Sequence, residues 1–349
     1  MTTPQPGLRG VVACVHDDVR NGAERDAPPN DRVIVDANAG IVVFHPDEAQ
    51  LTRLVARVAP ETREVAVFAN SPVSAELEAR LRDASGTTAL AVLRPEDNVG
   101  LGRAYNDLVS RAVSQGLQHL FLLDQDSLPE PGSLARLAET RRILRAGGER
   151  PAIVGPRPYG PDGRPMRIAR LAGQTARPID AAATPVQFVI SSGSLIGLEE
   201  AGAIGPFRPD YFIDAIDLEW CFRANALGFS IWIADDIRMD HSLGRGVIRL
   251  PGGLLLADQP PRRLYTFIRN QLSMLRLPHI PVRHRAKTVL SLPVRILVYL
   301  ARNRFSRETR AAIRNGVLDG IRNRLGPPDR AFAPWRGTRV SAKSSGIAS

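Results

Sequence analysis

Short runs of hydrophobic residues alternate with amphipathic segments from residue 39 onward. The apolar runs predict buried strands at Gly40–Phe44, Glu64–Phe68, Thr88–Leu93 and Gln118–Leu123. Apolar residues at helical spacing predict intervening helices over Glu48–Val58, Ser74–Ala84 and Gly102–Gln115. This alternation indicates an α/β fold with a mostly parallel sheet and helices on both faces. In such a sheet the ligand site lies at the carboxyl ends of the strands.

The second half of the chain has a less regular pattern. It predicts strands at Ala152–Gly155, Val186–Ile190 and Ser230–Ala234, and a helix over Asp217–Leu227 that Gly228 ends. From residue 256 to residue 334 the pattern is mostly helical. We therefore expect a disordered N-terminal extension over residues 1–38, a catalytic-type α/β domain over 39–255, a helical region over 256–334 and a disordered tail over 335–349.

Composition excludes two broad classes. The chain has 349 residues, of which 44% are hydrophobic and 23% charged, so it is not disordered throughout. Its two cysteines, Cys14 and Cys221, lie far apart without a CxxC spacing. They argue against a disulfide framework and a cysteine-rich zinc site, and they suit a reducing compartment.

Charge is concentrated near the C-terminus. The formal net charge is +10, yet the segment from Arg262 to Arg324 alone carries fifteen basic and two acidic residues, a net +13. The rest of the chain therefore sums to −3. A basic segment behind a near-neutral body favours a phosphate-rich partner such as a nucleic acid, lipid headgroups or a phosphorylated substrate.

The longest apolar stretch lies inside this basic segment. Val289–Ala301 is shorter than a membrane span and contains Pro293 and Arg295, while basic residues flank it on both sides. This pattern is typical of a helix in a membrane interface, but also of a core helix in a C-terminal subdomain. No secretory signal is recognisable at the N-terminus.

Paired carboxylates give the strongest local signal. Asp124 and Asp126 follow a predicted buried strand and can face one divalent cation, because residues i and i+2 share a side and hard cations prefer oxygen ligands. The alternative is a strand-to-helix turn in which Asp126 or Ser127 caps a helix that begins near Pro129.

A second carboxylate cluster lies at Asp214, Asp217 and Glu219, beside aromatic residues and a helix start. Carboxylates in apolar surroundings have raised pKa values and can serve as general bases. Alternatively, Asp214 or Asp217 is only a helix N-cap, and Glu219 forms a surface ion pair with Arg223.

Three weaker signals concern ligand binding. His241 follows a strand, and its imidazole can complete a metal site beside two carboxylates. The hydroxyl-rich turn that contains Ser192 and Gly193 can contact a sugar. A strand-to-helix junction supplies backbone N–H groups and a cation for an anionic donor, through Asn98, Gly100, Arg103 and Asn106.

The order of these motifs resembles that of family 2 inverting glycosyltransferases with the GT-A fold, within them the bacterial rhamnosyltransferase-like branch. The resemblance covers roughly residues 39–245, with weaker similarity at Arg263–Asn270 and Asn315–Gly326. It implies that Asp124 and Asp126 hold Mg²⁺ or Mn²⁺ against a nucleotide-sugar diphosphate, with His241 as a further ligand.

The resemblance also implies the remaining roles. Asp217 matches the catalytic base, Glu219 and Trp220 line the acceptor side, and His45 and Asn70 contact the donor nucleotide. One position departs from the family pattern, because Ala69 stands where an Asp usually contacts the base of the nucleotide. This difference leaves the identity of the nucleotide open.

Together these features predict a metal-dependent inverting glycosyltransferase. We expect it to move a sugar, rhamnose from dTDP-rhamnose by resemblance, onto a polysaccharide or lipid-linked acceptor at the inner, cytoplasmic face of an anionic membrane. A non-catalytic nucleotide-sugar-binding module and a basic nucleic-acid-binding protein are the alternatives. A nucleic-acid partner is not expected, because the chain is only 5% aromatic and lacks a nucleic-acid-binding signature.

Overall fold

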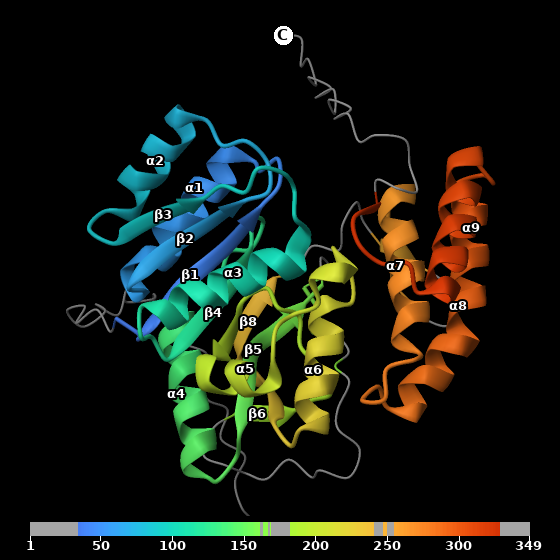
Figure 1. Cartoon of the computed structure of the whole chain (residues 1–349). Coiled ribbons are helices and arrows are strands. Elements are labelled where there is room, and N and C mark those ends of the chain that lie inside the picture. The colour runs from blue at the N-terminus through green and yellow to red at the C-terminus, as the bar shows by residue number, and fades with distance from the viewer. Residues whose placement is uncertain are drawn as a thin grey trace, which may run out of the picture. The chain divides into compact units, whose positions relative to one another are not determined.

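The computed structural model of the chain describes residues 34–160, 163–166, 168, 182–240, 247–249 and 255–328 (Figure 1). The predictions for His241, for most of the N-terminal extension and for the C-terminal tail lie outside these residues. The proposed domain boundaries remain predictions.

Most described strands belong to one sheet. Its strands are β1 (Ala37–Val43), β2 (Glu64–Ala69), β3 (Ala89–Leu93), β4 (His119–Asp124), β5 (Pro151–Tyr159), β6 (Ala183–Pro185), β7 (Ser194–Gly197) and β8 (Ser230–Asp240). Among the described residues the spatial order is β3-β2-β1-β4-β7-β5-β8-β6. The first four strands are mutually parallel, β5 and β8 are parallel, and β6 and β7 run antiparallel to their neighbours. The prediction of a mostly parallel sheet is confirmed.

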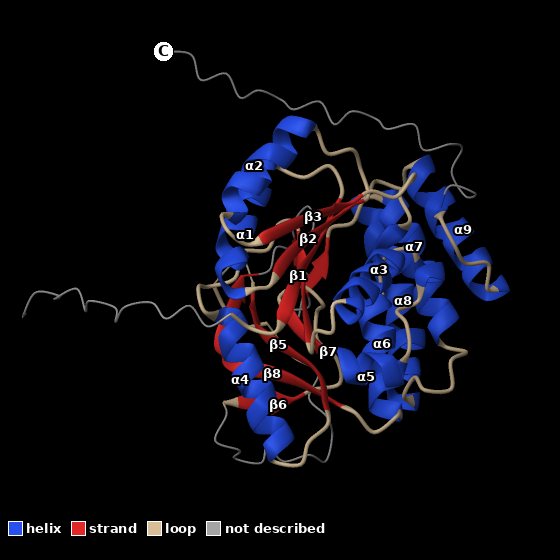
Figure 2. Ribbon diagram, turned by 60° about the vertical axis from the view of Figure 1, so that its left-hand side comes forward, coloured by secondary structure: helices blue, strands red, loops and turns tan. Residues whose placement is uncertain are grey.

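Helices cover both faces of this sheet, as predicted (Figure 2). The helices of the α/β region are α1 (Glu48–Val58), α2 (Ala75–Ser85), α3 (Gly100–Ser114), α4 (Ser133–Ala146), α5 (Leu198–Ile204) and α6 (Ile216–Ala226). One buried cluster joins α1, α2 and α4 to one face of the sheet, and a second joins α3, α5 and α6 to the other face. The division follows from the alternation of side chains along each strand: in β1, Ile41 belongs to the first cluster and Val42 to the second.

Local sequence explains several of the helix ends. Asp47 caps α1 by accepting a hydrogen bond from the backbone of Gln50, and Ser74 caps α2 in the same way through Leu77. The C-terminus of α6 is followed by Gly228, which adopts a positive φ of 79°. These boundaries agree with the sequence pattern to within two residues.

Three more helices follow the sheet: α7 (Pro261–Met274), α8 (Val282–Arg302) and α9 (Arg307–Arg322). They lie on the side of α3 and α6 (Figures 1 and 2). Helix α9 approaches α7 closely because Gly320 has no side chain: a Cβ there would come within 2.8 Å of the Leu272 Cβ. A short antiparallel pair, β9 (Val247–Arg249) and β10 (Leu255–Ala257), precedes α7. None of the described helices is both long and apolar enough to cross a membrane.

Two local predictions are wrong. Residues 186–190 do not form a strand; the chain there is irregular, and the paired segments are the shorter β6 and β7 on either side. The alternative in which Asp126 or Ser127 caps the next helix also fails. Helix α4 begins at Ser133 after Gly132, and the Glu61 carboxylate accepts from the backbone N–H groups of Gly132, Leu134 and Ala135.

Candidate active site

Asp124 is the last residue of β4, at the edge where the parallel strands end. In the register of the sheet it lies opposite Val42, near the end of β1. Its backbone N–H donates to the Ser192 hydroxyl over 3.1 Å. The next residue, Gln125, fixes the adjacent strand end, because its side-chain amide accepts from the N–H of Phe44 and donates to the carbonyl of the same residue. The turn that carries the carboxylate pair is thus attached both to the end of β1 and to the turn before β7.

Electrostatics show that carboxylates gather at this edge. The Asp124 side chain is only partly exposed, and burial raises its pKa to about 7, with further contributions from the negative charges of Asp126 and Asp217. Repulsion among carboxylates is relieved by a bound cation or by protonation. The edge therefore has an excess of negative charge that suits a positively charged ligand.

Asp217 lies in the first turn of α6, across the same site. One of its oxygens accepts from the Leu218 N–H over 2.8 Å, and the other from the Ser191 N–H over 3.4 Å. Burial raises its pKa, while these backbone hydrogen bonds oppose the rise. Ser191 also contacts the buried Tyr105 hydroxyl over 2.7 Å. Asp217 is thus held in a fixed orientation beside the turn that carries Ser192.

The backbone just before α6 adopts an unusual conformation. Phe212, Asp214 and Ala215 have positive φ values of 65°, 69° and 61°. Such values are uncommon for residues with a side chain and are maintained by surrounding contacts. The side-chain amide of Asn270 on α7 supplies three of them, by donating to the carbonyls of Tyr211, Ile213 and Asp214 over 2.8–3.1 Å.

Arg263 is a residue of this site that the sequence reasoning did not single out. It projects from α7 and pairs with Asp214 over 3.0 Å. Asp214 raises the pKa of Arg263 most, and Asp124 and Asp217 contribute too, so the guanidinium faces the carboxylate edge. In the sequence it is one of the basic residues of the C-terminal segment, and only the weak similarity over Arg263–Asn270 points to it.

The junction between β3 and α3 is tied to the end of β2. Asn70 accepts from the Val99 N–H over 3.2 Å and donates to the Gly100 carbonyl over 3.4 Å, while Asn98 accepts from the Gly100 N–H. Gly100 is required here, since its φ is 79° and a Cβ would lie 2.5 Å from the Phe212 carbonyl oxygen. The two predicted donor residues Asn70 and Asn98 thus shape this junction through their own side chains.

Other predicted donor residues have different surroundings. His45 follows β1, is exposed and has a positive φ of 48°. Arg103 is exposed and pairs with Asp107 on the same helix over 2.8 Å. Asn106 forms a pair of hydrogen bonds with the backbone of Phe207, so its amide is occupied within the fold.

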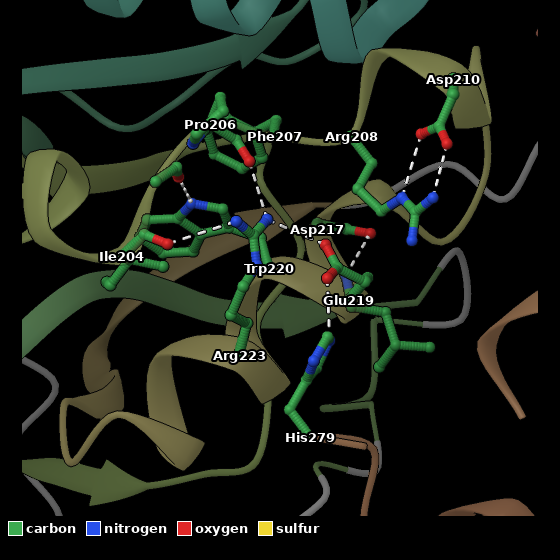
Figure 3. A network of polar contacts seen from close by, with 12 residues as sticks. Ile204, Pro206, Phe207, Arg208, Asp210, Asp217, Glu219, Trp220, Arg223 and His279 are labelled. Carbon is green, nitrogen blue, oxygen red and sulfur yellow. Dashed lines mark hydrogen bonds and ion pairs between the residues drawn. The ribbon is translucent and has the colours of Figure 1, made fainter. Parts of the chain in front are cut away.

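Glu219 and Trp220 lie inside the protein (Figure 3). Trp220 is 1% exposed, stacks on Phe207 and donates to the Gly205 carbonyl over 3.0 Å. Glu219 is 1% exposed and pairs with Arg223 over 3.0 Å and with His279 over 2.8 Å. The Glu219–Arg223 pair is therefore buried on the carboxylate side, contrary to the surface-pair alternative. The acceptor-side roles of Glu219 and Trp220 remain predictions, and Glu219 lines a surface cavity together with Arg208 and Arg223.

The turn with Ser192 and Gly193 is close to Asp124, and its predicted contact with a sugar remains a prediction. Ser192 contacts the Ser127 hydroxyl as well as the Asp124 backbone. The N–H of Gly193 donates to the Leu122 carbonyl over 2.7 Å, which extends the pairing of β4 with β7.

The donor set fits a hard divalent cation that shares its ligands with a phosphate. Asp124 and Asp126 offer carboxylate oxygens, and Mg²⁺ in proteins is commonly held by one or two carboxylates plus substrate phosphates. Within the described ranges, which exclude His241, no group of three His, Cys, Asp or Glu side chains is arranged to hold a metal by itself.

Comparisons with known proteins agree on one fold. No protein-family model matches the chain. It is 26% identical over 301 residues to the dTDP-rhamnosyl transferase RfbF of Shigella flexneri, a match that covers 82% of this chain and 96% of that protein. The solved structure of S. aureus TarS 1–349 in complex with UDP-GlcNAc superposes with a TM-score of 0.51 at 14% identity, covering 84% of this chain and 82% of TarS 1–349.

A second solved structure, GalNAc-T7 with UDP, GalNAc and Mn²⁺, gives a TM-score of 0.50 at 16% identity over 74% of this chain. The chain thus has the GT-A fold of these solved structures, and its sequence is similar to that of a dTDP-rhamnosyl transferase. It spans about half the length of GalNAc-T7 and of the longer TarS chain, at 55% and 50%.

Proposed function

We propose that this protein is a metal-dependent inverting glycosyltransferase of family 2. The observation that carries the proposal is the meeting of Asp124 and Asp126 at the end of β4 with Asp217 at the start of α6, on the sheet edge where α/β proteins bind ligands. The similarity to a dTDP-rhamnosyl transferase supports rhamnose from dTDP-rhamnose as the donor.

The nucleotide-sugar binds along the ends of β1, β2 and β4. His45, Asn70 and the backbone at Asn98–Gly100 line the nucleotide side, and Arg103 and Asn106 belong to the helix that begins there. Asp124 and Asp126 would hold Mg²⁺ or Mn²⁺, with His241 as a further ligand. Such a cation would neutralise charge on the diphosphate and make it a better leaving group.

Asp217 acts as the general base. The oxygen of an acceptor hydroxyl attacks the anomeric carbon, the bond from that carbon to the diphosphate oxygen breaks, and the hydroxyl proton passes to the Asp217 carboxylate. The diphosphate departs with the bonding electron pair, and attack from the opposite face inverts the anomeric centre. Burial favours this role, because it raises the proton affinity of Asp217 above that of an ordinary carboxylate.

Asp217→Asn tests the assignment of the base. We expect kcat to fall by about 10²–10⁴, since a positioned base contributes that much, while donor affinity is retained. Sugar transfer is measured in single turnovers, and donor binding by calorimetry. Asp236→Asn is the matched control, because that exposed carboxylate pairs with Arg136 outside the site. Wild-type transfer rates in folded, donor-binding Asp217→Asn would refute the assignment.

We also propose that the C-terminal helices attach the enzyme to an anionic membrane surface, at the cytoplasmic face. Helix α8 leaves a row of large apolar side chains exposed: Val282 77%, Val289 56%, Leu290 75%, Val294 53% and Leu297 63%. They recur at helical spacing, and basic residues flank them. An apolar stripe with flanking cations suits a helix that lies in the lipid headgroup region. This arrangement supports the interfacial interpretation of residues 289–301 over the core-helix alternative.

A further inference from the structure

A cavity of about 600 Å³ lies among α6, α7 and α8. Leu218 of α6, Phe267 and Gln271 of α7, and one face of α8 contribute to its lining. No residue at the ends of β1, β2 or β4 lines it, so it is separate from the proposed donor site. Its volume is within the usual range of small-molecule sites, about 300–1,000 Å³.

The α8 wall of this cavity is cationic. Arg283, Lys287 and Arg295 line it, and its described lining includes no carboxylate. Within the described part of the chain, none of the three pairs with an acidic side chain. A cavity with several cations and no internal counter-charge favours an anionic ligand.

Two polar atoms in the wall are buried without a hydrogen-bond partner among the described residues: Nε of Arg295 and Nε2 of His284. Such orphaned groups are uncommon in proteins and call for an explanation. Burial and the positive charges of Lys287 and Arg295 lower the pKa of His284, which is further evidence of a positive potential. Both atoms have almost no accessible surface, and the Arg295 guanidinium packs over the Phe267 ring, so a phosphate in the cavity would be bound by the positive potential of the wall and not by these two atoms.

The cavity continues toward the proposed base. Leu218, in its wall, directly follows Asp217. A second, apolar cavity of about 150 Å³ shares Phe188 with the first and reaches Ser192, the residue that contacts the Asp124 backbone. Phe188 and Ile168 line both cavities, so the two cavities are adjacent, one on the side of the carboxylate edge and the other at the cationic wall.

Helix α8 contributes to two different surfaces. The cavity side carries Arg283, Lys287 and Arg295, whereas Leu290 and Leu297 are exposed on another side. A molecule with a phosphate and an attached lipid can contact both, with its phosphate in the cavity and its hydrocarbon chain along the exposed apolar stripe.

We propose that this cavity binds the phosphate or diphosphate group of a lipid-linked saccharide acceptor. The inference rests on the proposed glycosyltransferase function and narrows its acceptor to a phosphate-bearing lipid. Bound in this way, the saccharide extends past Phe188 toward Ser192 and Asp217, where its hydroxyl reacts.

The test uses the full-length protein with geranyl diphosphate as the probe and EDTA present, so that no metal-dependent donor-site binding contributes. Calorimetry compares the wild type with Lys287→Gln and Arg295→Gln. We expect each substitution to weaken binding about tenfold, as for the loss of one charge-assisted hydrogen bond. Arg283→Gln is a further variant that should fold as the wild type does, since the Arg283 side chain is exposed.

Arg310→Gln and Arg314→Gln are matched controls, because these arginines are exposed on α9 and do not line the cavity. The controls should bind geranyl diphosphate as the wild type does. Equal losses of affinity in cavity and control variants, or no loss in either, would overturn the proposal.

Two further probes distinguish the possible sources of the bound phosphate, namely free pyrophosphate and a lipid surface. Inorganic pyrophosphate that binds as tightly as geranyl diphosphate would refute a lipid-linked ligand. Vesicle binding that depends on Lys287 and Arg295 as strongly as probe binding does would refute a discrete acceptor site.

Turnover of dTDP-rhamnose with Mn²⁺ is measured separately in the wild type. If dTDP-rhamnose is turned over but geranyl diphosphate binds equally well to the Lys287 and Arg295 variants, only the inference about the cavity is refuted. If the Lys287 and Arg295 substitutions weaken geranyl diphosphate binding but no nucleotide-sugar is turned over, the proposed function is refuted and the cavity is an anion-binding site only.

Discussion

The sheet edge and the C-terminal helices place their charges in opposite ways. At the edge, Asp124 and Asp217 are shielded enough that burial raises their pKa values, and backbone hydrogen bonds fix the turns that carry them. In the C-terminal helices, arginines such as Arg276 and Arg285 donate mainly to backbone carbonyls, and other basic residues are exposed. The first arrangement concentrates negative charge in one small site, and the second spreads positive charge over a surface.

The two regions are nevertheless connected. Arg263 and Asn270, both on α7, contact the segment that leads into α6 and the predicted base. The basic region is therefore more than an attachment surface, since it also supports the conformation of the carboxylate site. The following experiments separate these contributions.

The largest effect is expected from removal of the carboxylate pair. The double variant Asp124→Asn/Asp126→Asn should transfer sugar about 10⁴-fold more slowly, because it loses both cation binding and charge stabilisation at the diphosphate. Sugar transfer at saturating Mn²⁺ measures the loss. The unfolding temperature should not fall, since the substitution removes like-charge repulsion. Activity within tenfold of the wild type would show that the edge is not the metal site.

Membrane attachment should depend on the exposed apolar side chains of α8. Leu290→Glu/Leu297→Glu should weaken binding to phosphatidylglycerol vesicles about 100-fold, because two apolar side chains that would insert into the membrane are replaced and negative charge is added. Vesicle co-sedimentation gives the partition coefficient. Val113→Glu/Leu227→Glu is the control, with residues that are 53% and 50% exposed elsewhere on the protein. Equal losses in both double variants would contradict an interface at α8.

Asn270 tests the connection between the two regions. Asn270→Ala removes three hydrogen bonds to carbonyls before α6 and should lower the free energy of unfolding by about 3 kcal/mol. It should also reduce kcat, because the positive φ values at Asp214 and Ala215 lose support. Asn225→Ala, which removes a single bond to the Gln187 carbonyl, should cost about a third as much. Denaturant unfolding measures both variants. Equal losses of unfolding free energy would show that Asn270 contributes little to the contact between α7 and the segment before α6.

The smallest effect concerns the opposite end of β4. Burial and the neighbouring Arg141 lower the pKa of His119 from 6.5 to about 4. Between these values the unfolded chain binds a proton that the folded protein does not, so stability falls as the pH drops. Through this residue the free energy of unfolding should fall by about 2 kcal/mol between roughly pH 7.5 and pH 5. Denaturant unfolding at both pH values should show a smaller decrease for His119→Gln than for the wild type, and an equal decrease would contradict the assignment.

Sequence reasoning succeeded where a local pattern decides the structure. Helix α1 was predicted residue for residue, because its buried positions repeat at helical spacing and Asp47 caps it. The carboxylate pair was found because it follows the buried residues of β4. It failed at 186–190, where only the first residue, Val186, bonds to β8 and Phe188 packs edge-on against Phe222 of α6.

The sequence by itself determined the alternating strands and helices, the mostly parallel sheet, the carboxylates at its edge and the concentration of positive charge near the C-terminus. These properties follow from the order of residues along the chain. Only the tertiary structure decided that Trp220 and Glu219 are buried, that Arg263 faces Asp124 and Asp217 and that α8 separates a cationic wall from an apolar stripe. Each of these depends on which distant segments pack together, and hydrophobic periodicity does not specify those pairings.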